Sequence, residues 1–359
     1  MKNKLMYLAN AANIHTKRWA VHFSKTYSIT ILSFEDAKID GVEVIPLRSP
    51  LRGLMRYIWT IPFVRMTLAK IKPQILHAHY AGGYGLVGAL AGFHPYVLSV
   101  WGSDIYQAPR NSVIYRKILK FMLKQADYLC STSIAMASEA QRYVNRNFII
   151  TPFGIDCEIY RKFEVAGQSE EFVVGTVKKL DKLYGVDRLL QAFALLCGQA
   201  PRTRLRLLII GDGDERANLR DLANSLGISS SVEFYGGARQ EDVPTLLNRM
   251  TVYVALSRSE SFGVAVLEAS ACELPVVVSD AGGLPEVVVD GETGFVIKNG
   301  EPQLAAIAIK KLIGDPMLRD CMGAAGRKFV LSKYRWEYTV KELEGLYTEI
   351  SAAGSYKCD

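Results

Sequence analysis

The chain has 359 residues, of which 49% are hydrophobic and 22% are charged. This composition excludes a disordered chain, and at about 150 residues per domain the length predicts two domains. The six cysteines contain no C-x-x-C pair, so neither a disulfide framework nor a cysteine zinc site is indicated. A reducing, cytoplasmic setting therefore fits best.

The net charge of +7 is divided unevenly along the chain. Residues 1–150 carry 19 Lys and Arg against 7 Asp and Glu, whereas residues 151–359 carry 24 against 29. A basic first half predicts an anionic partner. No nucleic-acid-binding motif accompanies it, so a diphosphate or a membrane surface is favoured over nucleic acid.

The first segment, MKNKLMYLANAANIHT, predicts a strand and not a signal peptide, because Asn10 and Asn13 interrupt its apolar run. Residues 81–101 lack formal charge and approach the length of a membrane span, but five glycines and His94-Pro95 break the stretch. We expect a buried helix over Tyr84–Phe93 followed by a strand over Tyr96–Trp101.

Short apolar runs alternate with segments of helical period, which is typical of a parallel α/β sheet. The first half contains six predicted strands: Lys4–Ala9, Ser28–Ser33, Ile75–Ala78, Tyr96–Trp101, Tyr128–Ser131 and Phe148–Thr151. Around Thr151–Gly154 the chain turns into a second unit.

The second unit repeats this alternation. Its predicted strands are Phe172–Val177, Arg204–Ile210, Val232–Tyr235, Val252–Leu256, Pro275–Ser279 and Gly294–Ile297, with helices at Val186–Cys197, Glu215–Leu226 and Glu241–Arg249. The last segment, Trp336–Ile350, predicts a helix that packs back on the first domain. We therefore expect a domain over 1–153, a second over 154–332, and a C-terminal helical segment over 333–359. Doubly wound domains bind ligands at the carboxyl ends of their strands, so the loops after strands are the candidate sites.

The loop and helix after the strand Val252–Leu256 carry the densest functional signal, SRSESFGVAVLE, with Glu260 and Glu268 around a glycine turn. If Gly263 opens a helix, the amides near Phe262, Gly263 and Val264 form an anion site suited to a diphosphate. The alternative is that Glu260 belongs to a helix cap and Glu268 to a solvated face. The surrounding segment is too apolar for a solvated face, which favours a buried, partnered Glu268.

Other loops carry weaker signals. Lys178, Lys179 and Lys182 follow a strand and could neutralise a leaving diphosphate, or form a solvated loop. Asp212 and Asp214 imitate a D-x-D metal site, but Asp-Gly turn chemistry that caps the next helix explains them better. No G-x-G-x-x-G pattern with a later acidic residue and no Walker A pattern is present, so a nicotinamide dinucleotide is not indicated.

The histidines lie in the first half at positions 15, 22, 77, 79 and 94. His77 and His79 could ligate a metal, but no third ligand lies nearby in the sequence, so zinc is not expected. The loop Val100–Asp104 ends a strand with Trp101 and a carboxylate, which suit stacking on and hydrogen bonding to a sugar; core packing is the alternative for Trp101.

Taken together, these segments resemble glycosyltransferase family 4, the retaining nucleotide-sugar transferases of bacterial polysaccharide biosynthesis. The resemblance spans nearly the whole chain and is carried by these motifs: NIHTKRW from Asn13, HAHY from His77, VWGSD from Val100, PFGID from Pro152, Gly211-Asp-Gly213, the pair Glu260 and Glu268 separated by seven residues, ELPVV from Glu273 and DAGG from Asp280. The fold that it implies is GT-B, two Rossmann-like doubly wound domains facing across a cleft with a C-terminal crossover helix.

The resemblance also implies roles for individual residues. Glu268 would bind the ribose of the donor and Glu260 the donor sugar. Phe262, Gly263 and Val264 would give main-chain contacts to sugar and diphosphate, and Gly211 and Gly213 would belong to the donor site.

The family's phosphate-binding loop carries an arginine and a lysine, and here the match is incomplete. Lys179 stands at the arginine-like place, Tyr184 at the lysine-like place, and Lys182 is a candidate substitute. Relatives also carry a histidine near the reacting centre where this chain has Trp101. Asp104 is therefore a candidate catalytic residue, while His15 and His79 are active-site candidates without assigned roles.

The implied reaction transfers a sugar, with retention and without a metal or other cofactor, from a nucleotide-sugar donor to a hydroxyl of a glycan acceptor. A UDP-sugar is favoured over a GDP-sugar. Alternatives are a nucleotide-sugar epimerase with the same fold and a catalytically idle carbohydrate-binding protein. Arg48, Arg52 and Arg56, spaced by four, would form a basic stripe if their segment is helical. That stripe predicts peripheral attachment to the inner face of the cell membrane and a lipid-linked acceptor.

Overall fold

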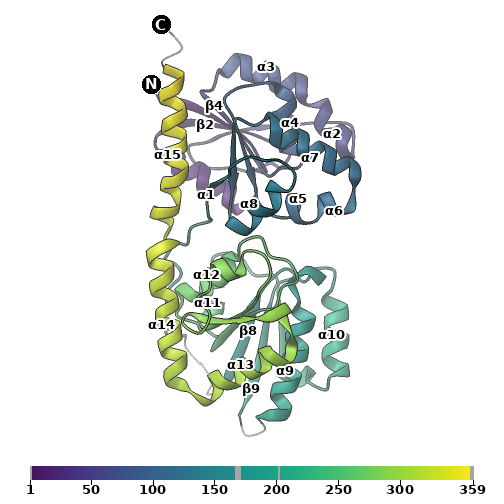
Figure 1. Cartoon of the computed structure of the whole chain (residues 1–359), viewed down its shortest axis with the longest axis vertical. Helices are drawn as coiled ribbons and strands as arrows, with labels where there is room; N and C mark the ends of the chain where they lie inside the picture. Colours follow the sequence, from purple (N-terminus) through teal and green to yellow (C-terminus); the bar gives the residue numbers. More distant parts are fainter. Residues whose placement is uncertain (1, 166–170, 201–202, 356–359) are drawn as a thin grey trace. The chain divides into compact units, whose positions relative to one another are not determined.

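The computed structural model describes residues 2–165, 171–200 and 203–355. The chain forms two compact units (Figure 1). Unit 1 comprises Met1–Phe153 and Val340–Asp359, and unit 2 comprises Gly154–Thr339. No helix in the described part of the chain is long and apolar enough to span a membrane.

The described residues of unit 1 form a seven-stranded parallel sheet in the order β3-β2-β1-β4-β5-β6-β7. Its strands are β1 Asn3–Leu8, β2 Tyr27–Ser33, β3 Glu43–Pro46, β4 Ile75–His79, β5 Tyr96–Val100, β6 Tyr128–Ser131 and β7 Ile149–Ile150. The connecting helices are α1 Ile14–Phe23, α2 Gly53–Trp59, α3 Ile61–Ile71, α4 Gly83–Ala91, α5 Ser103–Tyr106, α6 Ala108–Asn111, α7 Val113–Gln125 and α8 Ile134–Gln141. The central strands β4 and β5 are fully buried because helices cover both faces of the sheet.

The described residues of unit 2 form a six-stranded parallel sheet in the order β10-β9-β8-β11-β12-β13. Its strands are β8 Phe172–Val177, β9 Leu205–Ile210, β10 Val232–Gly236, β11 Val252–Ala255, β12 Val276–Ser279 and β13 Gly294–Ile297. Its helices are α9 Val186–Gln199, α10 Arg216–Ser225, α11 Val243–Leu247, α12 Val264–Ala271, α13 Pro302–Gly314 and α14 Pro316–Lys333. In each unit the order of the strands in the sheet reverses direction at one point, between β1 and β4 in unit 1 and between β8 and β11 in unit 2.

The last helix, α15 Trp336–Ser355, begins in unit 2 and continues into unit 1 from Val340 onward. Within unit 1 its Tyr347 is fully buried, lies edge-on to Phe23 at 4.9 Å, and bonds through its hydroxyl to His77 Nδ1 at 2.5 Å. A buried aromatic ring and a buried hydrogen bond therefore fix this helix on the sheet of unit 1.

The α/β architecture expected from the sequence is confirmed, and each predicted strand is present within one residue at either end. Strand β3 was missed because it is a half-exposed edge strand with Glu43 and Pro46 at its ends. The expected arginine stripe is not formed on one helix. Helix α2 begins at Gly53, so Arg48 and Arg52 precede it, and the Arg56 guanidinium lies over the Phe34 ring at 4.2 Å.

Candidate functional site

The candidate site of unit 2 lies at the carboxyl edge of its sheet, where the strand order reverses between β8 and β11. At such a switch point the loops that leave two neighbouring strands run in opposite directions and leave room for a ligand. The loop after β8 carries the three lysines, and the loop after β11 carries Glu260 and leads into α12. Residues 82 positions apart in sequence therefore meet at one edge.

Lys178 is the lysine that reaches Glu260. Its ammonium forms an ion pair with the Glu260 carboxylate, and the two side chains are only 8% and 10% exposed. Ser257 donates a hydrogen bond to the same carboxylate at 3.5 Å, and the ammonium lies 5.3 Å from the Tyr184 ring centre. Burial opposes the charge on Lys178, but the Glu260 carboxylate outweighs burial and raises the pKa of Lys178 above its ordinary value.

The loop that carries Glu260 is held by close backbone packing. A Cβ at Gly282 would lie 1.9 Å from the Glu260 carbonyl oxygen, and Gly283 donates its N–H to that oxygen at 3.0 Å. Gly282 also has φ +55, which favours glycine. The Gly282-Gly283 pair of the DAGG motif is therefore what allows the loops after β11 and β12 to touch.

Gly263 ends this loop with φ +106 and caps α12, as the sequence predicts. Phe262, 2% exposed, packs its ring against Tyr334 at 5.6 Å and anchors the turn. The Val264 amide opens the first turn, where an α-helix offers no carbonyl four residues earlier within the helix, and the helix dipole makes this end electropositive. The helix start therefore offers an anion site next to the Lys178 and Glu260 pair.

Glu268, in the second turn of α12, is 8% exposed, so the interpretation as a solvated face residue is wrong. Gln240 donates a hydrogen bond to its carboxylate at 3.4 Å and another to the Tyr160 hydroxyl. Gln240 and Tyr160 did not emerge from the sequence, because single polar residues in loops give no motif. They hold Glu268 in a fixed orientation at the edge of the sheet.

The other two lysines lie elsewhere. Lys179 is exposed. Lys182 is 80% exposed and points toward Glu215, 4.0 Å away, in a cavity of about 350 Å³ that Asp187 and Arg258 also line. The lysine-rich loop therefore places one buried lysine, Lys178, beside Glu260, and the sequence did not single it out from its neighbours.

Gly211 and Gly213 bring the loop after β9 against the loop after β8. A Cβ at Gly211 would lie 1.8 Å from the Lys178 carbonyl oxygen, and one at Gly213 would lie 2.3 Å from the Leu180 carbonyl oxygen. Between them, Asp212 accepts hydrogen bonds from the Gly213 amide at 2.9 Å and from Arg216 at 3.0 Å. These contacts support the turn interpretation of Asp212 and place Gly211 against Lys178 and Gly213 against Leu180.

In unit 1, the strand order reverses between β1 and β4. Asp104 lies at the carboxyl edge of the same sheet, in the segment that follows β5, the neighbour of β4. Its carboxylate is fully buried and accepts backbone hydrogen bonds from Ala81 at 2.8 Å and from Gly102 at 2.7 Å. Burial raises the pKa of Asp104 in spite of these bonds. The geometry favours a positioning role, in which Asp104 ties the loop after β4 to the loop after β5.

An aromatic cluster lies at the same edge of unit 1. His15 stacks on Phe153 at 3.8 Å, and His79 lies 4.9 Å from Trp101, which contacts Phe153 at 5.4 Å. Burial lowers the pKa of His15 to about 4 and that of His79 to about 3, so both imidazoles are neutral at pH 7. Among the described residues, the buried His79 Nδ1 has no hydrogen-bond partner.

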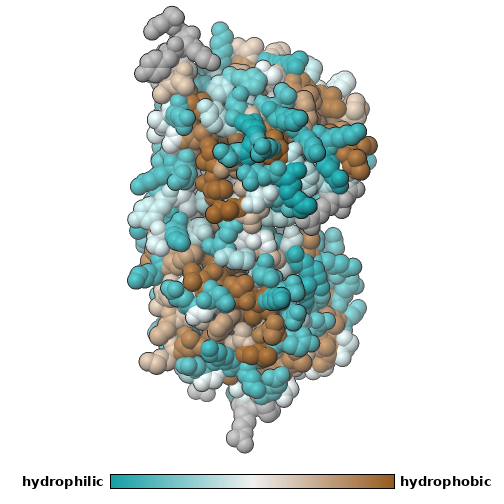
Figure 2. All heavy atoms as spheres, in the orientation of Figure 1, coloured by the Kyte–Doolittle hydropathy of each residue, from teal (hydrophilic) through white to brown (hydrophobic). Residues whose placement is uncertain are grey.

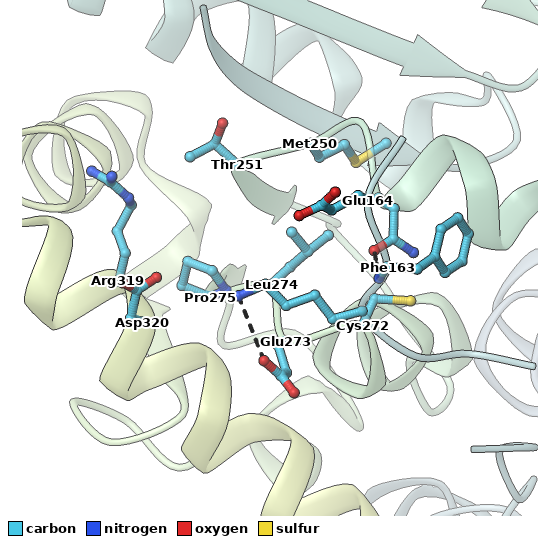
Figure 3. Close-up of a pocket in the computed structure, with 12 residues that line it drawn as sticks. Phe163, Glu164, Met250, Thr251, Cys272, Glu273, Leu274, Pro275, Arg319 and Asp320 are labelled. Carbon is cyan, nitrogen blue, oxygen red and sulfur yellow. Dashed lines mark hydrogen bonds and ion pairs between the residues drawn. The ribbon is translucent and has the colours of Figure 1, made fainter. Parts of the chain in front are cut away.

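Unit 2 also has a cavity of about 480 Å³ at the opposite, amino edge of its sheet (Figure 3). Thr251 and Pro275, which precede β11 and β12, form part of its wall, and Arg319 and Asp320 of α14 form another part. Glu273 forms an ion pair with Lys162 at 3.6 Å. None of the residues predicted to act on a donor lines this cavity.

Comparisons with known proteins agree with this geometry. The family model described as "Glycosyl transferases group 1" matches residues 160–329, and the model "Glycosyl transferase 4-like" matches residues 4–133. The two matches fall on unit 2 and unit 1 respectively and together cover most of the chain.

Several individual proteins are similar to this chain over most of their length. N-acetyl-alpha-D-glucosaminyl L-malate synthase of Bacillus anthracis is 29% identical over 77% of this chain and 75% of its own. The capsular polysaccharide biosynthesis glycosyltransferase CapM of Staphylococcus aureus is 26% identical over 97% of each chain. The structure of Anabaena HepE in complex with UDP and glucose superposes with a TM-score of 0.82 at 21% identity, covering 97% of this chain and 99% of that one.

The fold is therefore that of the GT-B glycosyltransferases, with two Rossmann-like units. The chain belongs to the glycosyltransferases of group 1, of the family 4 type found in bacteria.

Proposed function

We propose that this glycosyltransferase moves a sugar from a nucleotide-sugar donor, a UDP-sugar in preference to a GDP-sugar, to a hydroxyl of a lipid-linked glycan during cell-surface polysaccharide assembly. Transfer proceeds with retention and without a metal ion. The observation that carries the proposal is the buried pair of Lys178 and Glu260 at the switch point of unit 2, beside the N-terminus of α12.

The proposed donor binds along the carboxyl edge of unit 2. Its diphosphate lies at the start of α12, where the amides of Gly263 and Val264 donate to phosphate oxygens and Lys178 supplies the positive charge. Glu268, held by Gln240, accepts hydrogen bonds from the ribose hydroxyls. Because the diphosphate leaves as the bond to the sugar breaks, this charge stabilises the transition state more than the bound substrate.

Glu260 is proposed to bind the hydroxyls of the donor sugar. A carboxylate that is already paired with Lys178 is held in one orientation, so the sugar meets a preorganised acceptor of hydrogen bonds. The acceptor hydroxyl then attacks on the face from which the diphosphate departs, which retains the configuration at the anomeric carbon. No protein nucleophile is required, and the chain contributes by positioning the substrates and by stabilising charge.

The glycan acceptor is proposed to bind at the carboxyl edge of unit 1. Trp101 offers an apolar ring for stacking on a sugar, and the buried, neutral His79 packs against that ring and supports it. The CapM relative, whose name places it in capsular polysaccharide biosynthesis, supports a glycan acceptor.

The test begins with binding, because it does not require the acceptor. Thermal unfolding of the wild-type protein is measured with UDP, GDP, ADP and CMP, where a ligand at 100 times its Kd adds about 2.7 kcal/mol. The expected result is stabilisation by UDP above the others, loss of this stabilisation in Glu268→Ala, and its retention in Glu292→Ala, an exposed matched control. Stabilisation by none of the four nucleotides, or an equal response in both variants, would contradict the proposed donor site.

Turnover then separates the alternatives. Incubation of the UDP-sugar that binds best with a membrane lipid extract, followed by NMR of the product, should give an α-linkage from an α-configured donor, with unchanged rate in EDTA. Conversion of the UDP-sugar into an epimer without acceptor would favour an epimerase instead.

A further inference from the structure

The loop after β11 carries an arginine that bridges two other segments of unit 2. Arg258 lies two residues before Glu260, and its guanidinium donates two hydrogen bonds to the Asp187 carboxylate, at 2.7 and 2.6 Å. The same guanidinium donates to the main-chain carbonyl of Lys182 at 2.8 Å. Asp187 lies in the first turn of α9, and Lys182 lies in the loop after β8. We call this bridge between the two loops and the start of α9 the loop clamp.

Main-chain contacts join the same two loops. The Arg258 amide donates to the Leu183 carbonyl at 2.7 Å, and the Ser259 amide donates to that carbonyl at 3.4 Å. Gly185, with φ +63, allows a further close approach, since a Cβ there would lie 2.0 Å from the Leu256 carbonyl oxygen. The loops after β8 and β11 are therefore in direct contact beside the loop clamp.

The ion pair of Lys178 and Glu260 joins the clamped loops at another point. Lys178 begins the loop after β8, four residues before the carbonyl that accepts from Arg258. Glu260 follows Arg258 by two residues in the loop after β11. Tyr184, whose ring centre lies 5.3 Å from the Lys178 ammonium, belongs to the clamped segment as well. The separation of the two loops sets how Lys178 meets Glu260, and the loop clamp fixes that separation.

The loop clamp is more exposed to solvent than the ion pair that it supports. Arg258 and Asp187 are 38% and 34% exposed and line the cavity of about 350 Å³, which neither Lys178 nor Glu260 lines. Hydrophilic spheres predominate on the part of unit 2 over α10, whose Leu219 lines the same cavity (Figure 2). Three hydrogen bonds already hold the guanidinium. We therefore expect it to hold the loops and not to bind the donor.

We propose that Arg258 and Asp187 are positioning residues for the transfer reaction, and that the loop clamp keeps Lys178 aligned with Glu260 on the donor. This inference rests on the proposed function of that ion pair. A partly exposed ion pair adds little to folding stability, because water screens its charges. A displacement of about 1 Å in a preorganised group, in contrast, lowers the rate about 100-fold. Loss of the clamp should therefore slow turnover more than it destabilises the fold.

The test compares Asp187→Asn and Arg258→Gln with the wild type by initial rates with the UDP-sugar and the lipid extract, calorimetric titration with UDP, and urea unfolding. Both variants should lower kcat by about 10- to 100-fold and raise the Kd for UDP by less than about threefold, because the clamp acts on alignment. Arg258→Lys keeps the charge but loses the two-pronged geometry, so it should recover part of kcat. Asp187→Asn, which preserves the side-chain shape, keeps the test decisive if Arg258→Gln does not fold.

Arg249→Gln is the matched control. Arg249 pairs with Glu233 at 3.3 Å, and the two side chains are 37% and 32% exposed, close to the values for the loop clamp. This pair lies where β10 and β11 begin, at the opposite edge of the sheet, so the control should retain the kcat of the wild type. An equal loss of kcat in Arg249→Gln and Arg258→Gln would overturn the positioning role. A rise in the Kd for UDP as large as the fall in kcat would place Arg258 on the donor itself and would overturn it too.

Coupling to Lys178 separates positioning from a purely structural role. In the Lys178→Met background, Asp187→Asn should lower kcat by less than about threefold, because no cation remains for the clamp to align. The full 10- to 100-fold loss in that background would contradict the proposal. An unchanged kcat in Lys178→Met alone would contradict the proposed function. A large loss in Lys178→Met together with wild-type kcat in Asp187→Asn and Arg258→Gln would overturn the loop clamp and leave the proposed function standing.

Discussion

The two units share one architecture, yet their carboxyl edges differ in chemistry. Unit 2 places a buried ion pair, Lys178 and Glu260, beside the electropositive start of α12. Unit 1 places neutral imidazoles and aromatic rings at the equivalent point: His15, His79, Trp101 and Phe153. Charge at one edge suits a diphosphate, and uncharged rings at the other suit a sugar.

The difference arises from burial and pairing. A buried charge persists only with a partner, and Lys178 keeps its charge because Glu260 lies against it. Among the residues that the structure describes, no carboxylate pairs with His15 or His79, so burial leaves both imidazoles neutral. Two copies of one fold thus present different chemistry at the same edge because a few side chains decide where charge is retained.

The largest expected effect comes from Lys178→Met. If Lys178 stabilises the leaving diphosphate as proposed, removing its charge should lower kcat by about 10²- to 10³-fold. The variant also leaves the Glu260 carboxylate buried and unpaired, at a cost of about 3–5 kcal/mol of folding stability. Steady-state kinetics with the UDP-sugar, and urea unfolding of the same samples, measure the two effects.

Lys178→Arg and Lys179→Met are the controls. The arginine retains the charge and should recover a substantial part of both turnover and stability, which separates a lost charge from a damaged fold. Lys179 stands at the arginine-like place of the family pattern but is exposed, so Lys179→Met should reduce turnover less than Lys178→Met. The reverse order would show that the family alignment, and not the buried ion pair, identifies the functional lysine.

The next effect concerns the nucleotide. Glu268→Gln keeps the shape of the side chain and removes its charge, so hydrogen bonds to ribose weaken from charge-assisted to neutral ones. We expect a 10- to 100-fold rise in the Kd for UDP with a smaller change in kcat. Glu260→Gln should show the opposite split, because Glu260 is proposed to bind the donor sugar and Glu268 the ribose. Calorimetric titration with UDP gives the Kd, and initial rates give kcat. Equal effects on Kd and kcat in both variants would contradict the separate roles of Glu268 and Glu260.

Much of this contrast could be predicted from the sequence, and some of it could not. The strands and the Glu260 to Glu268 segment were predictable because apolar runs and a glycine at a helix start are local signals. The role of Lys178 could not be predicted, because its burial depends on its ion pair with Glu260, 82 residues away. The sequence alone does not distinguish it from the neighbouring Lys179 and Lys182. Gly211 and Gly213 were assigned to the donor site by the family resemblance, but their close packing against the backbone of Lys178 and Leu180 gives no local signal in the sequence.

A third effect tests the neutral edge of unit 1 through pH. The pKa of His15 is about 4 and that of His79 about 3, against 6.5 for an ordinary histidine. The unfolded chain therefore binds more protons than the folded chain below pH 6.5, and stability falls as the pH drops from 6.5 through 4 to 3. At about 1.4 kcal/mol per pKa unit, the two residues together account for several kcal/mol.

Unfolding by urea between pH 7 and pH 4 measures this loss. His79→Gln removes one titrating group and should make the free energy of unfolding depend less on pH. The difference in this free energy between the variant and the wild type should be smaller at pH 7 than at pH 4. His94→Gln is the matched control, because His94 is exposed and bonded to Asp127 at 2.7 Å. A wild-type stability that is constant over this range would mean that the imidazoles of the neutral edge are accessible to protons in the folded chain.

The smallest expected effect is that of Lys182→Gln, at the carboxyl edge of unit 2. Lys182 is 80% exposed and points toward Glu215, away from Glu260, so Lys182→Gln should change the UDP affinity and kcat by less than about twofold, the range of a weak surface ion pair. Such a result would show that the positive charge of unit 2 acts from one buried position and not from the lysine-rich loop as a whole. A loss comparable to that of Lys178→Met would instead mean that the loop rearranges on the donor and brings Lys182 to the diphosphate. The comparison between the units would then be one between a mobile charged loop and a fixed aromatic edge.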